Sequence, residues 1–381
     1  MIFVLSGFSN INKGAELMFD AVVQEIEQYA PNSTVYLPVA AFRGRVPNNS
    51  NTLTFKYKPI EKFIRIIRKF HLNGILRKLH LPEILDDIYA IKNADYFIDG
   101  SGLVFSDVQR LDSHLYRWEH LLRNQKKQNT KIIFLPQMFG PCEKEATKAT
   151  FKILNKYADL IFAREKASFS YIKDSGLIDM QKVFLCTDFT PLVHGVVPPE
   201  YKHLENAVCL IPNNRMYGTR KISKETYFAF LKAIIRHLQE IGKGVYLLNH
   251  EGEKDDVICQ QIRSELNNGI EVVTGLDAIQ TKGLISSAGL VISSRFHGVA
   301  SSLNTGVPCL ATSWSHKYSE LFHDFGITDG VLSPEDIEAC IQKIDSLLEP
   351  ENNQKVRKQL AERLPDINKS IHHMWEQIWK I

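Results

Sequence analysis

Short apolar runs alternate with longer amphipathic stretches along most of the chain, and this alternation restricts the fold more than any other feature. The runs are rich in Val, Ile and Phe, which is typical of strands buried in a parallel sheet. The predicted strands are 3–6, 35–38, 96–99, 132–136, 160–163, 183–186, 207–211, 245–248, 271–273, 290–293 and 308–311. The sequence therefore predicts an α/β fold made of doubly wound parallel sheets.

A break in this alternation at 192–204, which includes Pro198 and Pro199, indicates a domain boundary. We expect an N-terminal Rossmann-like domain at 1–198 and a C-terminal one at 199–349, followed by a helical tail at 350–381 that packs back on the first domain. Two such domains facing a cleft are the simplest architecture for 381 residues. Ligands of these sheets bind at the carboxyl ends of the strands, so the residues after each strand are the candidates for function.

Composition excludes several classes of protein. The net charge of +3 is too small to indicate nucleic-acid binding. No apolar run approaches the roughly 20 residues of a membrane-spanning helix, and no basic segment precedes the apolar N-terminus as in a signal peptide. Six scattered cysteines favour reduced thiols in a cytoplasmic protein. The sequence contains no HExxH, GxSxG or phosphate-loop motif, so we expect neither a metal nor a cofactor.

The segment 56–80 carries eight Lys or Arg residues and one acid, with apolar residues at helical spacing. The ordinary interpretation is a docked helix with a solvated basic face. The alternative is peripheral contact with an anionic membrane, at its cytoplasmic face, or with a lipid-linked substrate.

The most informative stretch is 291–300, where a predicted strand runs directly into a helix. Ser294, Arg295, Phe296, His297 and Gly298 lie at this junction. Backbone N–H groups at a helix start bind anions, Arg can grip them with two parallel hydrogen bonds, and His can exchange a proton near neutral pH. The 42 residues between Asp277 and Glu320 contain no carboxylate but do contain cations, among them Lys317. The alternative is an arginine paired to a neighbouring carboxylate and a hydrogen-bonded core histidine.

Other strand ends carry weaker signals. Arg164 and Ser168 lie on one face of a helix start, where Arg164 is either a second cation for the ligand or part of a surface ion-pair cluster with Glu165 and Lys166. After further strands of the first domain come residues that suit a hydroxyl-rich ligand such as a sugar, although Asn at such positions also caps helices. These candidates are Asn12, Gly14, Glu16, Gly100, Ser101 and Gln137.

Two acidic stretches of the second domain favour solvent exposure. His250-Glu251-Gly252-Glu253 follows a predicted strand and could position a ligand hydroxyl, but an exposed loop is favoured. Asp255-Asp256 lies in a helical pattern and is expected to be solvated.

Several motifs together resemble the polysaccharide pyruvyl transferase family. They are Gly100-Ser101-Gly102 with Asp107, Leu135 to Pro141, Ala158-Asp159 through Glu165 with Ser168, Ser293 to Gly298, and Gly306-Val307-Pro308 followed by Lys317. The most specific is Arg295-Phe296-His297-Gly298 with its downstream Gly-Val-Pro. The family often has three glycines where this chain has Gly100-Ser101-Gly102, which leaves the acceptor sugar open.

The resemblance implies a fold like the two-domain B-type glycosyltransferases. It also implies transfer of an enolpyruvyl unit from phosphoenolpyruvate, as co-substrate, to two hydroxyls of one sugar. The product would be a pyruvate ketal, made during surface or capsular polysaccharide biosynthesis. The matching Arg164, Arg295 and His297 would contact the donor, with Arg295 and His297 catalytic and Lys317 a secondary cation. The domain at 1–198 is then expected to be the acceptor side and the domain at 199–349 the donor side.

Other features of such a reaction stay open. The base for the sugar hydroxyl could be Glu16, Asp188 or Glu251, and the acceptor could be a free sugar or a lipid-linked oligosaccharide. The alternatives are a nucleotide-sugar-dependent glycosyltransferase of the same fold and a non-catalytic sugar-binding subunit.

Overall fold

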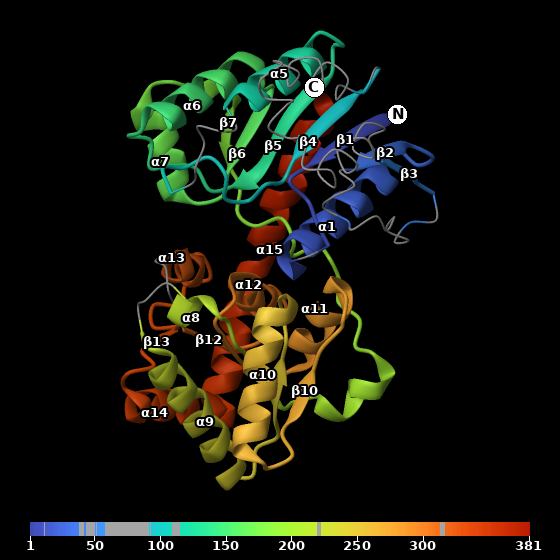
Figure 1. The fold of residues 1–381 in the computed structure, drawn as a ribbon. Coiled ribbons are helices and arrows are strands. Elements are labelled where there is room, and N and C mark those ends of the chain that lie inside the picture. Colours follow the sequence, from blue (N-terminus) through green and yellow to red (C-terminus); the bar gives the residue numbers. More distant parts are fainter. Residues whose placement is uncertain are drawn as a thin grey trace, which may run out of the picture. The chain divides into compact units, whose positions relative to one another are not determined.

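The computed structural model describes residues 1–10, 12–37, 42, 50, 52–57, 91, 93–108, 115–218, 222–312 and 317–381. Contacts divide the chain into two compact units (Figure 1). Unit 1 comprises Met1–Ile11, Met18–Phe189 and Ser370–Ile381, and unit 2 comprises Asn12–Leu17 and Thr190–Lys369. This division into units says nothing of what each part binds. The assignment of 1–198 to the acceptor sugar and of 199–349 to the donor stays a prediction.

Within its described residues, unit 1 contains a parallel sheet of seven strands in the order β3-β2-β1-β4-β5-β6-β7. The strands are β1 (Ile2–Ser6), β2 (Thr34–Leu37), β3 (Thr54–Tyr57), β4 (Tyr96–Asp99), β5 (Lys131–Gln137), β6 (Leu160–Ala163) and β7 (Val183–Leu185). Every residue of β4 and β6 is buried, because helices cover both faces of a parallel sheet. Its helices in the ranges that the structure describes include α1 (Lys13–Tyr29), α5 (Leu115–Lys126), α6 (Glu145–Tyr157), α7 (Lys166–Ser175) and the 3₁₀ turn Met180–Lys182.

Unit 2 contains a second parallel sheet, in the order β10-β9-β8-β11-β12-β13. Its strands are β8 (Val208–Ile211), β9 (Val245–Leu248), β10 (Glu271–Val273), β11 (Leu290–Ser293), β12 (Cys309–Thr312) and β13 (Val331–Leu332). Alternate residues of β8 enter two different hydrophobic clusters, Cys209 and Ile211 on one face and Val208 and Leu210 on the other. This strand is therefore apolar throughout.

Helices cover both faces of the second sheet. They are α8 (Arg215–Gly218), α9 (Lys224–Glu240), α10 (Gly252–Leu266), α11 (Ala278–Ser287), α12 (Phe296–Asn304), α13 (Lys317–Asp324), α14 (Ile337–Leu348) and the 3₁₀ helix Pro199–Leu204. The last helix, α15 (Pro350–Lys380), belongs to unit 2 up to Lys369 and to unit 1 from Ser370. In unit 1 its Trp379 stacks on Tyr29 with the ring centroids 4.2 Å apart.

The α/β prediction is confirmed, and all eleven predicted strands are present with each end within one residue. Two strands, β3 and β13, were not predicted from the sequence. The first has the polar sequence Thr-Phe-Lys-Tyr at the sheet edge, and the second has only two residues. Lys56 and Tyr57 of the basic segment belong to β3, whereas 58–80 lie outside the described residues, so membrane contact there stays a prediction.

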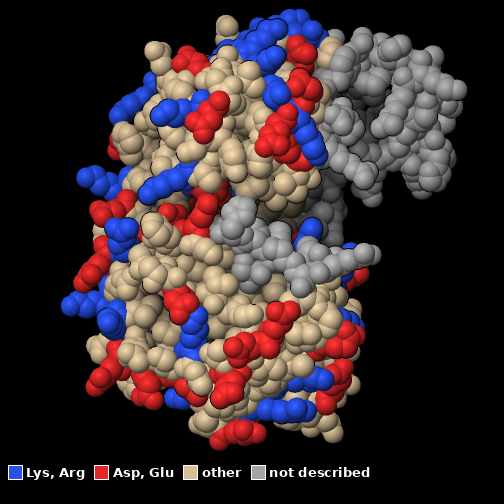
Figure 2. All heavy atoms as spheres, turned by 90° about the vertical axis from the view of Figure 1, so that its left-hand side faces the viewer, with Lys and Arg blue, Asp and Glu red and all other residues tan. Residues whose placement is uncertain are grey.

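No helix within the described ranges is long and apolar enough to cross a bilayer. On the face drawn in Figure 2, basic and acidic side chains are interspersed, in agreement with the small net charge of +3.

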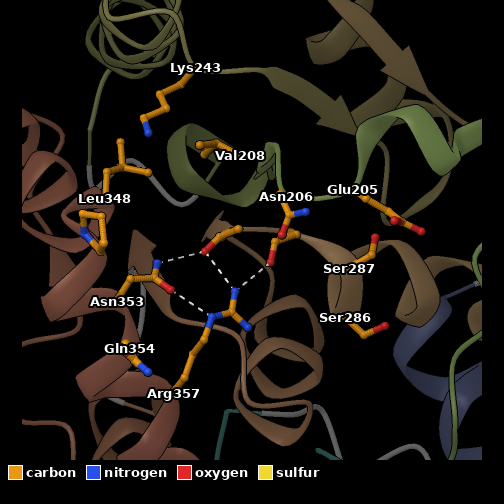
Figure 3. Close-up of a pocket in the computed structure, with 13 residues that line it drawn as sticks. Glu205, Asn206, Val208, Lys243, Ser286, Ser287, Leu348, Asn353, Gln354 and Arg357 are labelled. Carbon is orange, nitrogen blue, oxygen red and sulfur yellow. Dashed lines mark hydrogen bonds between the residues drawn. The ribbon is translucent and has the colours of Figure 1, made fainter.

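A polar pocket of about 560 Å³ lies at the amino ends of β8 and β11 (Figure 3). Its arginine, Arg357, donates hydrogen bonds to Ala288 O at 3.1 Å, Gly289 O at 3.3 Å and Gly306 O at 3.4 Å. Asn353 accepts from Arg357 Nε at 2.9 Å and donates to Gly289 O at 3.1 Å. These contacts attach the first turns of α15 to carbonyl groups that follow α11 (Ala288, Gly289) and α12 (Gly306), so the guanidinium has a structural role.

Replacing Arg357 by Ala would leave these carbonyl groups without their charged donor. We expect Arg357→Ala to lower the free energy of unfolding by about 2 kcal/mol, measured by urea denaturation. Lys355→Ala, an exposed change on the same helix, is the control and should have little effect. Equal stability of the two variants would contradict this role of Arg357.

Candidate active site

The strand order of unit 2 places its candidate site at the carboxyl ends of β8 and β11. The chain continues from β8 to β9 on one side of the sheet and from β11 to β12 on the other side. Doubly wound sheets bind their ligands at the point where the direction changes in this way. Asn213 and Asn214 follow β8, Ser294 and Arg295 follow β11, and His250 follows β9. The candidates from 294–298 therefore lie at the topological switch point of their sheet.

Ser294 is the centre of a buried hydrogen-bond network that fixes the start of α12. Its Oγ lies 2.6 Å from Tyr227 Oη and 2.5 Å from Thr312 Oγ1. Its carbonyl accepts from Asn213 Nδ2 and Tyr318 Oη, both at 2.8 Å. Four side chains from separate elements thus hold the junction where Arg295 begins. A direct role of Ser294 in donor binding stays a prediction.

Arg295 is held by two carboxylates from the start of α10. Its Nε and Nη2 lie 2.7 and 2.6 Å from Asp255 Oδ2, and its Nη1 pairs with Glu251. Asn214 Oδ1 accepts from Nη2 at 3.4 Å. Burial raises the pKa of Asp255 to about 7 and lowers the pKa of Arg295 to about 10. The ion pairing is the one that the alternative interpretation of the sequence allowed.

His297 lies in the first turn of α12, directly against Gly14. A Cβ at Gly14 would overlap the imidazole ring, so only glycine leaves room for this packing. Asn12 caps the helix that carries Gly14, because its Oδ1 accepts from Gly14 N at 2.8 Å and Ala15 N at 3.3 Å. The structure therefore places the segment Asn12–Leu17 in unit 2, beside His297.

Glu16 belongs to the same segment and forms an ion pair with Lys13, with 2.6 Å between Oε2 and Nζ. Burial raises the pKa of Glu16, the negative charge of Asp277 adds to this, and Lys13 opposes it. Asn12, Gly14 and Glu16, predicted to bind the acceptor, are thus grouped with His297 rather than with Gly100, Ser101 and Gln137 in unit 1.

The remaining candidates of this region have packing partners. Phe296 makes an edge-on contact with Tyr318, with the centroids 6.0 Å apart. A Cβ at Gly298 would lie 2.5 Å from Ser293 Oγ, so this glycine allows α12 to approach β11 closely. The side chain of Lys317 lies outside the described part of the chain. Ligand contacts by these residues stay predictions.

The predicted exposure of two acidic stretches is wrong for two residues. His250 is buried at 5% exposure, and Asp255 is fully buried. Burial, followed by the positive charges of Arg295, His297 and Lys13, lowers the pKa of His250 well below its usual value. The spacing of Glu251 and Asp255, four residues apart, could have indicated a shared helix face.

Unit 1 gathers Gly100, Ser101 and Gln137 around the buried carboxylate of Asp99, at the ends of β4 and β5. Asp99 accepts from Ser101 N at 3.1 Å, Ser101 Oγ at 2.9 Å and Gln137 Nε2 at 3.4 Å. Burial raises the pKa of Asp99, and these hydrogen bonds oppose the shift. Among the described residues Gln137 Oε1 is buried without a hydrogen-bond partner. The sequence pattern marked the residues that follow this strand, but it gave no sign that Asp99, the last residue of β4, organises them.

Arg164 is buried at 8% exposure and pairs with its neighbour Glu165, with 2.6 Å between Nε and Oε1. Ser168 Oγ donates to Glu165 Oε2 at 2.8 Å and accepts from Phe139 N at 3.0 Å. The Arg164–Glu165 pair of the alternative interpretation is therefore present, but it is buried and not at the surface as expected. Donor binding by Arg164 stays a prediction.

No group of three or more His, Cys, Asp or Glu side chains that could hold a metal ion occurs in the part of the chain that the structure describes. The expectation that the protein needs no metal or cofactor stays a prediction.

The buried His250 predicts a specific pH dependence of stability. Since the pKa of this side chain in the folded state lies well below the ordinary 6.5, the unfolded state takes up the proton first as pH falls. Stability is therefore complete above pH 6.5 and decreases below it, by about 1 kcal/mol from this residue over the first pH unit. His250→Asn should remove that part of the dependence in urea denaturation, whereas His373→Asn, at an exposed position of α15, should not. Identical pH profiles for wild type and His250→Asn would refute the assignment.

The contact between Gly14 and His297 predicts a steric cost. Gly14→Ala forces the imidazole or the first turn of α1 to move, and we expect a loss of about 1–3 kcal/mol in the free energy of unfolding. Gly244→Ala is the matched change, since its Cβ would lie 3.3 Å from the nearest atom, Ala207 Cβ. Similar unfolding midpoints for both variants would show that the contact is not tight.

Comparison with solved structures supports the fold. The UDP-GlcNAc 2-epimerase of Neisseria meningitidis, solved with UDP-GlcNAc, is 11% identical with a TM-score of 0.59 and covers 100% of both chains. HepE from Anabaena, solved with UDP and glucose, is 13% identical with a TM-score of 0.58, covering 100% of this chain and 98% of that one. MnaA from S. aureus, solved with UDP, gives 13% identity and a TM-score of 0.58, with 99% and 95% covered. At such identities the similarity shows a fold like B-type glycosyltransferases and these epimerases, and nothing of the reaction.

Sequence comparison identifies the family. A search of curated proteins gave no match. The sequence model of the polysaccharide pyruvyl transferase family matches residues 12–316, which include the segment beside His297 and the whole of α12. The chain therefore belongs to the polysaccharide pyruvyl transferase family, a family of enzymes.

Proposed function

We propose that this enzyme transfers an enolpyruvyl unit from phosphoenolpyruvate to two hydroxyls of one sugar residue, forming a pyruvate ketal in surface or capsular polysaccharide biosynthesis. The family match supports the reaction class. The observation that carries the proposal furthest is the position of Arg295 and His297. They occupy the start of α12 at the carboxyl end of β11, which is the ligand-binding edge of the second sheet.

The reaction needs an acid, a base and a cation. Protonated His297 donates a proton to the methylene carbon of phosphoenolpyruvate, and C2 becomes electrophilic. One sugar hydroxyl adds to C2, and its proton passes to the base and from there back to His297, which restores the acid. The C2–O bond to the phosphate breaks, the second hydroxyl adds, and inorganic phosphate leaves with the second proton. Arg295 stabilises the anionic oxygens throughout, and Arg164 is a further proposed donor contact.

Glu16 is the base that we favour for the sugar hydroxyl. It lies in the same helical turn as Gly14, whose backbone packs on His297, and its pKa is raised by burial. A carboxylate whose pKa is raised towards neutrality is a better general base. Of the other two candidates, Glu251 is paired with Arg295 in this structure, and Asp188 is grouped with unit 1 rather than with His297.

The acceptor and the location of the reaction belong to the same proposal. A sugar or lipid-linked oligosaccharide supplies the two hydroxyls, and the polar groups around Asp99 suit hydroxyl binding. Lys317 is a secondary cation for the donor. The enzyme acts in the cytoplasm without a metal, and any membrane contact is made through 56–80.

A donor assay distinguishes this proposal from a nucleotide-sugar-dependent transferase. The structural relatives named above were solved with UDP or UDP-GlcNAc, which makes a UDP-sugar the relevant alternative donor. Phosphate release from phosphoenolpyruvate with a panel of sugar acceptors, together with a new ketal methyl signal in proton NMR, would support the proposal. UDP release from a UDP-sugar, without any reaction of phosphoenolpyruvate, would overturn it. Sugar binding without turnover of either donor would indicate a non-catalytic subunit.

Conservative variants test the two central residues. Arg295→Ala would leave the buried Asp255 unpaired and endanger folding, so Arg295→Lys is the better change because it keeps the charge and loses the planar fork. We expect Arg295→Lys and His297→Asn each to lower kcat/KM for phosphoenolpyruvate by about 100-fold. Arg263→Lys, an exposed change near the end of α10, should keep wild-type activity. Near-normal kcat/KM in either central variant would contradict its role.

A further inference from the structure

The two carboxylates that hold Arg295 differ in accessibility. The side chain of Asp255 is 0% exposed, whereas that of Glu251 is 28% exposed. Both belong to the start of α10, four residues apart, and both therefore reach the same guanidinium. The difference in burial suggests that the two pairs have different functions.

Asp255 is fully engaged on both oxygens. Oδ2 accepts from Nε and Nη2 of Arg295 at 2.7 and 2.6 Å, and Oδ1 accepts from Asn214 N at 3.0 Å. A carboxylate bound by three donors without solvent exposure fixes the orientation of the guanidinium plane. Asp255 therefore leaves Nη1 as the guanidinium nitrogen that is available to another partner.

Glu251 is the partner of Nη1 in this structure. It is the N-cap residue of α10, yet its side chain accepts no hydrogen bond from its own helix and pairs with Arg295 Nη1 instead. The place it fills combines a guanidinium corner with the positive end of the α10 dipole, which favours any small anion. A partly exposed Glu side chain can leave this place by rotation, at little structural cost.

We infer that Glu251 occupies the place of an anionic group of the substrate on Arg295 and leaves when that group binds, whereas Asp255 stays as the positioning residue. This inference rests on the proposed function for the identity of the substrate, phosphoenolpyruvate. The exchange replaces one carboxylate by an anionic group of the donor, so Arg295 has an anionic partner both before and after the donor binds. Discrimination against neutral ligands follows, because they cannot displace Glu251 from a guanidinium.

The two positions predict opposite effects on donor affinity. Glu251→Gln removes a competitor, and we expect the Kd for phosphoenolpyruvate in calorimetry to fall about 3- to 10-fold, with a lower KM and no rise in kcat. Asp255→Asn releases the guanidinium and should raise the Kd at least 10-fold. Glu253→Gln, at an exposed position in the first turn of α10, is the matched control and should bind like wild type.

An unchanged or weaker affinity in Glu251→Gln would overturn the inference. So would wild-type affinity in a folded Asp255→Asn variant. Should Asp255→Asn fail to fold, the result for Glu251→Gln decides alone. A second titration, with inorganic phosphate as the probe, separates this inference from the proposed function. The same opposite shifts with phosphate, in a protein that never turns over phosphoenolpyruvate, would uphold the exchange at Arg295 and reject the donor.

Discussion

The ion pairs between Arg295 and the start of α10 are the interaction on which the candidate site depends. A guanidinium that is 12% exposed needs compensation, and the fully buried Asp255 supplies it. The same pair determines that Nη1 is the guanidinium nitrogen that faces a ligand. Phosphoenolpyruvate is an anion, so a site with one free arginine and a site with an arginine already held by carboxylates behave differently. The arginine held by carboxylates binds an anion less tightly, but its guanidinium already has a fixed orientation.

The fold creates this geometry through the topology of the second sheet. β8 and β11 are neighbours at its centre, so the residues after them converge although they are about 80 positions apart in the chain. The network of Ser294 with Tyr227, Thr312 and Tyr318 fixes the junction, and Gly298 lets α12 lie close to β11. Gly14 then brings the first turn of α1 against His297. Rigid supports of this kind are what a site needs to keep reacting groups in place.

The sequence predicted the elements that are buried on both faces, because such strands are continuous apolar runs. It failed at β3, whose alternating polar residues lie at an edge, and at the two residues of β13. Within the site, the junction around Arg295 was visible because strand, cation and glycine are adjacent in sequence. The roles of Asp255 and His250 were not visible, because their burial comes from tertiary packing. Polar residues of these types usually lie in contact with solvent. The grouping of Asn12–Leu17 with unit 2 likewise depends on contacts that no local pattern encodes.

A crystal structure of the enzyme with phosphoenolpyruvate tests the central claim most directly. We expect an anionic oxygen of the ligand on Arg295 Nη1, Glu251 rotated away from the guanidinium, and Asp255 still bound to Nε and Nη2. A ligand bound at saturating concentration without contact to Arg295, or with both carboxylates still in place, would contradict it.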